Sequence, residues 1–465
     1  MSTWLKKWEP ENELFWKTEG GKHANCTLWI TTFSLIFSFA TWFVMSAVVV
    51  RLPNIGFKFE PMQLFWLAAM PGLAGGTFRL IHTFLIPIYG TRHVITIATI
   101  VKILPMLMLG FAVQNPETPY GHFLVIAILC GFGGGDFSSY MPSTSLHFPK
   151  HLQGYAMGIQ ACIGNFGVSL TQFVTPWIVS FAALGTIVGA PQVFTKGETI
   201  KNIWLQNAGF WYVPALLIAT VLCWHTLRSI RIDKPSVGGM IKNMTDNKHA
   251  WFCVITYVMT FGSFSGFSAA FPLMIKTIYG GFEGAPDPLK YAFYGPLVGS
   301  LIRTLMGAPS DRMGGSVWLM VSGIGLVLGC FALIFGGALT PTSLEQFPMF
   351  VWIMLWMFLM AGIGNAATFR QYPIVFAFSP RQGAQILGWT GAWAAYGPFI
   401  FSALIGATIM SYGNAKIFFW GALVFYSIAT WINWRYYTRK GAERYDWGTK
   451  WGTWWDKAKD GWEKK

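Results

Sequence analysis

Apolar segments long enough to cross a membrane recur along almost the whole chain, separated by short polar or basic stretches. A helix needs about 20 mostly apolar residues to span the hydrocarbon of a bilayer. The pattern therefore predicts an all-α polytopic membrane protein. Its twelve spans are expected at residues 27–50, 62–88, 93–113, 120–148, 152–182, 207–227, 249–275, 289–310, 316–338, 347–378, 382–411 and 414–434.

Composition and charge agree with this class. Of the 465 residues, 54% are hydrophobic and 11% are charged, whereas soluble domains contain about 25% charged residues. Residues 1–25 are polar and show no cleavable signal pattern, so we expect the first span to direct insertion. With both termini in the cytoplasm, most Lys and Arg outside the spans lie on that side. The net charge of +14 then reflects the orientation of the spans in the membrane. Because the basic residues are spread over many loops, they argue against nucleic-acid binding.

A basic connection at residues 229–248 separates two sets of six spans. We expect a cytoplasmic N-terminal segment at 1–26, six-helix halves at 27–228 and 249–438, and a Trp/Lys-rich cytoplasmic tail at 439–465. In helical form, the tail would place Trp447, Trp451, Trp454 and Trp455 on one face. That face predicts a helix at the membrane interface, with a partner-binding helix as the alternative.

The two halves also match in sequence, in the same order along the chain. Gly72-Leu-Ala-Gly-Gly-Thr-Phe-Arg79 has a counterpart in Pro296-Leu-Val-Gly-Ser-Leu-Ile-Arg303, and the Gly-rich ends of spans four and ten are followed by equally spaced prolines. Parallel six-span halves describe one architecture of secondary transporters, in which the substrate binds at mid-membrane between the halves.

Arginines at mid-membrane depth are the strongest candidates for function. Arg79 and Arg303 hold equivalent positions in the repeat, and a guanidinium at that depth is costly unless it is paired or lines a watery cavity. Its planar fork of donors matches a planar oxyanion, so we predict an anion site between them. The alternative is that each caps helix carbonyls. For Arg370 the two interpretations stay open, because Ser139 takes its place in the other half.

Smaller polar and glycine positions add to this picture. Asn165 is expected either to contact a ligand or to hold helices together, and Gly164, Gly167 and Gly397 would let helices approach and slide. The sequence contains no His/Cys/Asp cluster at metal-ligand spacing and no Cys-x-x-Cys pair. We therefore expect no metal, no cofactor and no enzyme activity.

From residue 8 to about residue 439 the chain resembles the nitrate/nitrite porters of the major facilitator superfamily. The resemblance rests on Gly158-Ile-Gln-Ala-Cys-Ile-Gly-Asn-Phe-Gly-Val-Ser169, on Thr260-Phe-Gly-Ser-Phe-Ser-Gly-Phe-Ser268, and on the loop Ser310-Asp311-Arg312-Met-Gly-Gly315. It implies the major facilitator fold, a bacterial inner-membrane location, and a monomer in the lipid bilayer. It also implies nitrate and nitrite as substrates, in nitrate assimilation or respiration.

The resemblance assigns roles to particular residues. It implies that two arginines grip the anion while aromatic rings sandwich it, and that a cytoplasmic loop gates the transporter. The implied binding residues are Arg79, Arg303, Asn165, Tyr257, Phe137, Phe369, Phe39 and Phe261, and the implied gating residues are Asp311 and Arg312.

Two charged residues depart from the family pattern. Lys102 stands where an apolar residue is usual, and Asp136 where a neutral one is usual. Because spans three and four run antiparallel, both lie at similar depth, and we predict a buried ion pair that leaves the arginines uncompensated. The alternative is that Asp136 reaches Arg79 as a proton-titrating carboxylate beside the substrate, with His82 as a weaker candidate.

Charge also predicts the mechanism. Two buried guanidiniums repel each other until an anion binds, so we expect obligatory exchange of nitrate (in) for nitrite (out) by alternating access. Proton-coupled nitrate symport through Asp136 is the alternative. A channel would need rings of pore residues and an enzyme would need a nucleophile or metal site; a sensor without transport stays open at this point.

Overall fold

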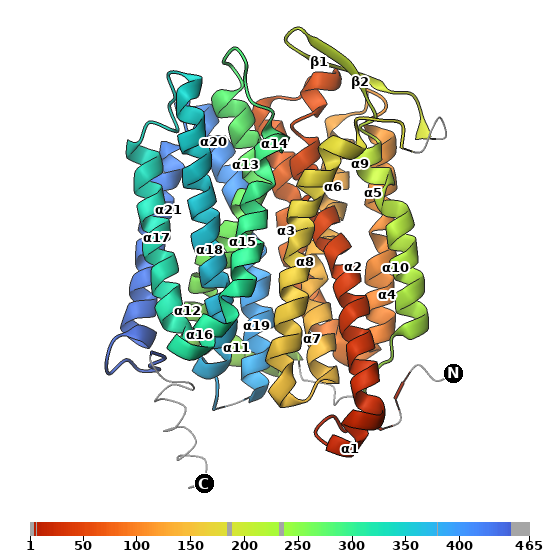
Figure 1. The fold of residues 1–465 in the computed structure, drawn as a ribbon, viewed down its shortest axis with the longest axis vertical. Helices are drawn as coiled ribbons and strands as arrows, with labels where there is room; N and C mark the ends of the chain where they lie inside the picture. The colour runs from red at the N-terminus through yellow and green to blue at the C-terminus, as the bar shows by residue number, and fades with distance from the viewer. Residues whose placement is uncertain (1–3, 6, 184–187, 232–236, 379, 448–465) are drawn as a thin grey trace.

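In a computed structural model, the structure describes residues 4–5, 7–183, 188–231, 237–378 and 380–447. Long helices run side by side through its whole height and form two groups, one coloured red to yellow-green and the other green to blue (Figure 1). A hairpin of β1 (Gln192–Lys196) and β2 (Thr199–Ile203) lies at one end, which we call the hairpin end. The opposite end carries α1 (Glu13–Phe15), α11 (Val237–Thr245) and α16 (Gly307–Met313), and we call it the α16 end.

The first group is built from the N-terminal part of the chain. After the π-helical turn η1 (Trp16–Gly20), its elements are α2 (Gly21–Val48), the 3-10 turn η2 (Leu52–Ile55), α3 (Pro61–Tyr89), α4 (Thr91–Val101), α5 (Ile103–Ala112), α6 (Tyr120–Gly135), α7 (Phe137–His147), α8 (Lys150–Ile178), α9 (Asn207–Phe210) and α10 (Tyr212–Thr226).

The second group follows α11. Its elements are α12 (Lys248–Tyr257), the π-helical turn η4 (Val258–Gly262), α13 (Ser263–Tyr279), α14 (Pro288–Ala292), α15 (Tyr294–Leu305), α16, α17 (Gly315–Phe335), the 3-10 turn η5 (Leu344–Gln346), α18 (Phe347–Val375), α19 (Pro380–Ala394), α20 (Gly397–Tyr412), α21 (Lys416–Asn433) and the π-helical turn η6 (Trp434–Thr438).

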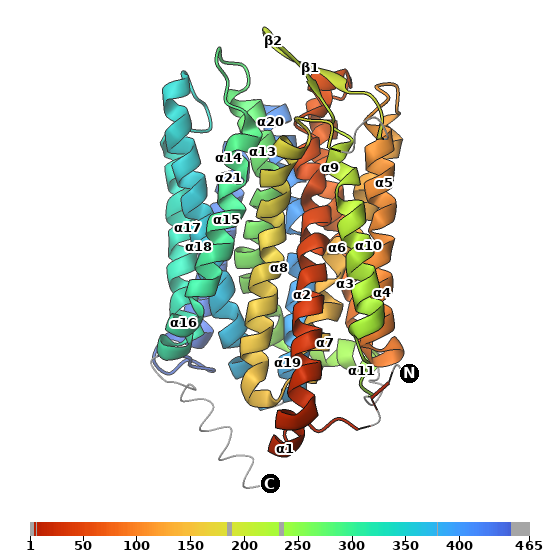
Figure 2. The same cartoon turned by 45° about the vertical axis from the view of Figure 1, so that its right-hand side comes forward.

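The crossing helices agree with the expected fold class. By length and apolar composition, ten helical segments of the described residues could each cross a membrane. The helix α8 and the α14–α16 segment also run along the bundle in both views (Figures 1 and 2), so the ten segments are consistent with the predicted twelve. The β-hairpin lies between the spans predicted at 152–182 and 207–227, where the hydrophobic pattern predicts no element.

Several crossing segments are interrupted midway along their length. Lys102 separates α4 from α5 and Asp136 separates α6 from α7, although both residues keep right-handed helical dihedral angles. The turn η4 inserts a π-helical stretch between α12 and α13, and α19 ends shortly before α20 begins. Such local departures from regular α-helix are frequent at functional sites, and they occur here beside the predicted site residues.

The two groups meet along α3 with α20, α8 with α15, and α13 with α2. On α3, a Cβ atom added at Gly72 would lie 2.5 Å from the backbone nitrogen of Phe399. A side chain at this position would therefore collide with the other group. Close approach of the two groups at this seam depends on the absence of that side chain.

Polar contacts also join the two groups at the hairpin end. Nη2 of Arg51 donates to Oδ1 and Oδ2 of Asp287 at 2.9 and 2.7 Å. Nζ of Lys276 donates to the carbonyl of Val50 at 2.6 Å, and Nζ of Lys196, at the end of β1, donates to the carbonyl of Ala285 at 2.8 Å. These contacts join the two groups at the hairpin end.

The Trp-rich tail is described only in part. Trp447 is 47% exposed, whereas Trp451, Trp454, Trp455 and Trp462 lie outside the described residues. The predicted interfacial helix stays a prediction.

The contact between α2 and α8 yields a stability prediction. A Cβ at Gly167 would lie 2.1 Å from the carbonyl oxygen of Ile36, whereas a Cβ at Gly158 on the same helix would meet nothing within 4 Å. We expect Gly167→Ala to destabilise the protein by about 1–3 kcal/mol through overpacking. Gly158→Ala should be neutral or slightly stabilising because alanine favours helix. Thermal unfolding in detergent checks both, and equal melting temperatures for the two variants would contradict the packing argument.

Candidate functional site

Arg79 lies on α3 at the seam between the two groups and is fully buried. Its Nε donates to the carbonyl of Gly134 on α6 at 2.7 Å, and its Nη1 donates to the carbonyl of Gly391 on α19 at 2.8 Å. Its Nη2 has no hydrogen-bond partner among the described residues. Two of its donors therefore cap carbonyls, as the alternative interpretation expected, and one donor remains available to a ligand.

Aromatic rings surround the guanidinium of Arg79. Its Cζ lies 4.8 Å from the ring centroid of Phe137, 5.1 Å from that of Phe261 and 5.3 Å from that of Trp42. Phe39 packs edge-on against both Phe137 and Trp42. Trp42 was not among the sequence candidates. Ring faces attract a guanidinium, so these contacts hold the cation in place without neutralising it.

Arg303 occupies the equivalent place on α15 in the second group. It is 6% exposed, and its Nη1 and Nη2 atoms have no hydrogen-bond partner among the described residues. Its Cζ lies 4.6 Å from the ring centroid of Phe369 on α18. The Tyr257 side chain interacts with Arg303 and stacks on Phe261, with ring centroids 5.5 Å apart. A continuous set of rings thus links the surroundings of the two arginines.

The electrostatics of this site are unbalanced. The positive charge of Arg303 acts unfavourably on that of Arg79. The three unpartnered Nη atoms are buried donors, and a buried donor without an acceptor costs about 1–3 kcal/mol, or more when it is charged. A small oxyanion would remove both penalties, because its negative charge offsets the repulsion and its oxygen atoms accept the free donors.

The remaining predicted positions are Asn165 and three glycines. Asn165 on α8 is 1% exposed, and its Oδ1 lacks a hydrogen-bond partner in the described part of the chain. Gly164 and Gly167 face α2, and Gly397 faces the carbonyl of Gly262 in η4. These glycines permit close packing inside each group, and a role in gating stays a prediction.

The predicted ion pair between Lys102 and Asp136 is confirmed. Each side chain is 1% exposed, and Nζ of Lys102 donates to Oδ2 of Asp136. Oγ of Ser38 on α2 donates to the same carboxylate oxygen at 2.6 Å and accepts from Nζ of Lys102 at 2.9 Å. The pair therefore ties together α2 and the two interrupted helices.

Arg370 on α18 binds the segment that follows η6. Its Nη1 donates to Oδ1 of Asp446, a fully buried residue. Oδ2 of Asp446 accepts from the backbone nitrogens of Gly315 and Ser316 at 3.0 and 3.3 Å, at the start of α17. Sequence reasoning missed this partner, because Asp446 is far from Arg370 along the chain and lies in the expected tail.

The predicted gating residues Asp311 and Arg312 are exposed at the end of α16. No ion pair joins either of them to another residue described by the structure. Their gating role stays a prediction.

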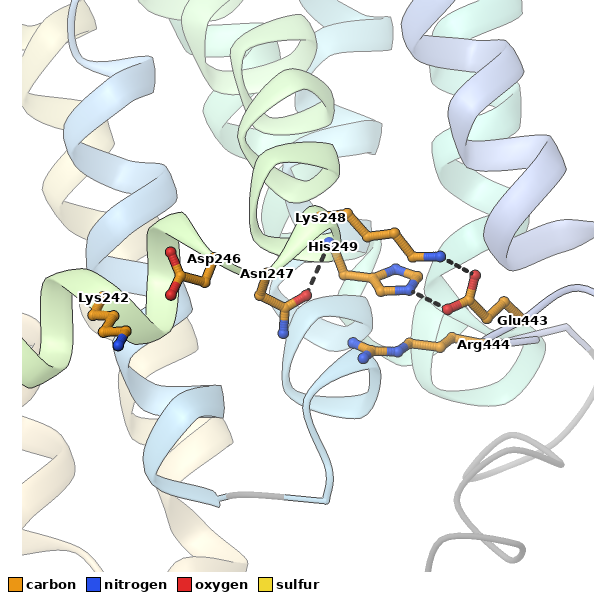
Figure 3. Close-up of a pocket in the computed structure, with 7 residues that line it drawn as sticks. All are labelled: Lys242, Asp246, Asn247, Lys248, His249, Glu443 and Arg444. Atoms are coloured by element: carbon orange, nitrogen blue, oxygen red, sulfur yellow. Dashed lines mark hydrogen bonds and ion pairs between the residues drawn. The ribbon is translucent and has the colours of Figure 1, made fainter.

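A second contact of the C-terminal segment lines a pocket of about 390 Å³ at the α16 end (Figure 3). Nζ of Lys248 donates to Oε2 of Glu443 at 2.8 Å, and Nε2 of His249 lies 2.9 Å from Oε1. Burial alone would raise the pKa of Glu443, but these hydrogen bonds outweigh it and lower the pKa to about 2. The pocket is lined by Lys242, Asp246, Asn247, Lys248, His249, Glu443 and Arg444.

Comparison with known proteins adds independent information. Residues 28–379 match the family model of the Major Facilitator Superfamily. The probable nitrate/nitrite antiporter NarK2 of Thermus thermophilus is 54% identical over 95% of this chain and 98% of its own length. The nitrate/nitrite transporter NarU of Escherichia coli (strain K12) is 35% identical over 94% and 96%. A crystal structure of the D-xylose-proton symporter aligns with a TM-score of 0.64 over 89% of this chain and 98% of that chain, at 14% identity, which shows the fold alone.

The contacts of the C-terminal segment yield a second stability prediction. Asp446→Asn removes the carboxylate from a buried pair with Arg370, and such a loss costs about 3–5 kcal/mol. Glu443→Gln is the matched control, because the Glu443 side chain is 44% exposed and exposed ion pairs contribute about 1 kcal/mol or less. We expect thermal unfolding to show a clearly larger loss for Asp446→Asn. Similar losses in both variants would contradict the importance of the buried pair.

Proposed function

The chain belongs to the nitrate/nitrite porter family of the Major Facilitator Superfamily, and we propose that it exchanges nitrate for nitrite by alternating access, with the anion held between Arg79 and Arg303. It is a multi-pass membrane transporter and not an enzyme. The names of its relatives support nitrate and nitrite as its substrates. The observation that carries the proposal is the set of buried, unpartnered guanidinium donors, one on Arg79 and two on Arg303.

Shape supports a small planar anion at this place. Each guanidinium is flanked by a ring, Phe137 beside Arg79 and Phe369 beside Arg303. Aromatic rings offer flat faces against which a planar ion can lie. Hydrogen bonds from charged donors to oxyanions are stronger than neutral ones. Nitrate and nitrite combine a small size, a planar shape and accepting oxygen atoms.

Obligatory exchange follows from the fixed charge. Arginine does not lose its proton at any working pH, so the repulsion between Arg79 and Arg303 persists in every state without an anion. Closing both sides around two uncompensated cations is unfavourable in a medium of low dielectric constant. The loaded carrier can close and reopen on the other side, and its return then requires a second anion.

The two ends of the bundle are assigned to the two sides of the membrane. We place the hairpin end outside and the α16 end in the cytoplasm of a bacterial inner membrane, in line with the positive-inside rule. The halves at 27–228 and 249–438 are the bodies that rock. Contacts at the hairpin end, such as the Arg51–Asp287 ion pair, close the outer side in this state, and they would have to break when nitrate enters from outside.

Proton-coupled nitrate symport is the second candidate. One observation favours it: Asp136 is a buried carboxylate that interacts electrostatically with Arg79. Its ion pair with Lys102 argues against a proton-carrying role, because the carboxylate is already engaged by a buried ammonium group.

Lysine substitutions test the geometry of the anion site. Arg79→Lys and Arg303→Lys keep the positive charge but remove the planar fork of donors. We expect counterflow of labelled nitrate against nitrite in vesicles to fall about 10- to 100-fold, since each hydrogen bond to a charged group contributes about 1.5–3 kcal/mol. Arg435→Lys, at the partly exposed turn η6, is the control. Wild-type counterflow in both test variants would remove the geometric basis of the proposal.

Vesicles also distinguish exchange from symport. We expect nitrate uptake by the wild-type protein only when nitrite or nitrate is present inside, because the anion-free carrier cannot return. An imposed pH gradient should not replace the internal anion. Uptake into vesicles without internal anion, driven by an inward proton gradient and lost in Asp136→Asn, would instead establish proton-coupled symport.

A further inference from the structure

We propose that Lys102 and Asp136 act as positioning residues for the anion site. Lys102 neutralises Asp136 and so keeps Arg79 available to the substrate. The pair also fixes the junction between α6 and α7, which contacts Arg79. This inference rests on the proposed function, since the quantity affected is nitrate binding. It assigns the pair a role in binding without contact to the anion.

The junction between α6 and α7 forms one side of the Arg79 environment. Asp136 is the residue between these helices. Two residues before it, the carbonyl of Gly134 accepts from Nε of Arg79 at 2.7 Å. One residue after it, the ring of Phe137 lies 4.8 Å from Cζ of Arg79. Any displacement of Asp136 therefore moves both a hydrogen-bond acceptor and a ring that hold the guanidinium.

The pair fixes this junction against two other elements. Lys102 stands between α4 and α5, and Ser38 on α2 hydrogen bonds to both charged groups. A Cβ added at the neighbouring Gly133 would lie 2.1 Å from the carbonyl oxygen of Ser38. The backbones of α2 and α6 are thus in close contact beside the ion pair, which adds polar contacts between the same elements.

The charge of Asp136 matters as much as its position. Lys102 and Ser38 both bind its Oδ2, whereas its Oδ1 has no hydrogen-bond partner among the described residues. Asp136 also interacts electrostatically with Arg79. Without Lys102, the carboxylate would stand uncompensated beside Arg79, and opposite charges attract strongly in a buried environment. Arg79 would then be neutralised from within the protein, and a substrate anion would meet less positive charge.

Other ionisable groups near Asp136 do not replace Lys102. Arg79 and His82 face it from α3, Tyr140 from α7 and Cys223 from α10. The Tyr140 hydroxyl is hydrogen bonded to Ser34 and Thr99, and His82 Nδ1 lies 2.8 Å from the hydroxyl of Ser139. All these groups remain in the variants described next, so their effect on nitrate binding is the same in each variant.

The test compares Lys102→Met, Asp136→Asn and the double variant by nitrate titration of the purified protein. At about pH 8, we expect Lys102→Met to weaken nitrate binding about tenfold or more, because the carboxylate now competes with the anion for Arg79. The double variant should bind within about threefold of wild type at the same pH, since it contains neither charge.

Controls separate this role from simple stabilisation. Lys102→Arg keeps the positive charge and should bind nitrate like the wild type, and thermal unfolding of every variant verifies folding. If Lys102→Met does not fold, Lys102→Gln gives the same comparison, because it removes the charge but keeps a hydrogen-bond donor.

Two results would overturn the inference. In the first, the neutral Lys102 variant binds nitrate like the wild type at about pH 8. In the second, the double variant binds nitrate as weakly as the neutral Lys102 variant, which is the behaviour of a purely structural pair. A folded wild-type protein that does not bind nitrate at all would instead contradict the proposed function.

Discussion

The burial of two guanidinium groups that form no ion pair with any described residue is the constraint on which the rest of the structure depends. Arg79 and Arg303 come from different groups of helices, and together they leave three donors without acceptors. Burial of permanent charge is tolerable only where the surroundings compensate part of its cost. Here the compensation comes from aromatic faces and, for Arg79, from backbone carbonyls, neither of which removes the net positive charge. An incoming oxyanion can supply what these neutral partners cannot.

The surrounding structure keeps the two arginines free of carboxylate partners, because nearby carboxylates form ion pairs with other cations. Asp136 is bound by Lys102, Asp287 by Arg51 at the hairpin end, and Asp446 by Arg370 at the α16 end. The chain contains few acidic residues, and each of these three buried or partly buried ones is held by a cation of its own. The pairs also tie helices together, so the same contacts contribute to the fold and to the charge balance at the centre.

Sequence could predict the fold and the ion pair because both leave direct signals. Apolar stretches of spanning length mark the helices, and Lys102 and Asp136 stand out as charges at equal depth. Other features leave no such signal. The acceptors of Arg79 are backbone carbonyls, which every residue has, and the side chain of Trp42 resembles any other core aromatic. The Arg370–Asp446 contact joins parts of the chain that are far apart in sequence. The β-hairpin lies between two spans, where the apolar pattern predicts no element.

The hydrogen bond from Nη1 of Arg79 to the carbonyl of Gly391 crosses from one group of helices to the other. In the proposed mechanism, the side chain that binds the anion therefore also joins the two groups of helices. If the α16 end opens by separating α3 from α19, this bond breaks and Nη1 becomes accessible to water at the moment when the anion departs. Hydration of the freed donor would then assist release of the anion, and closing of the same end would expel that water before the next cycle.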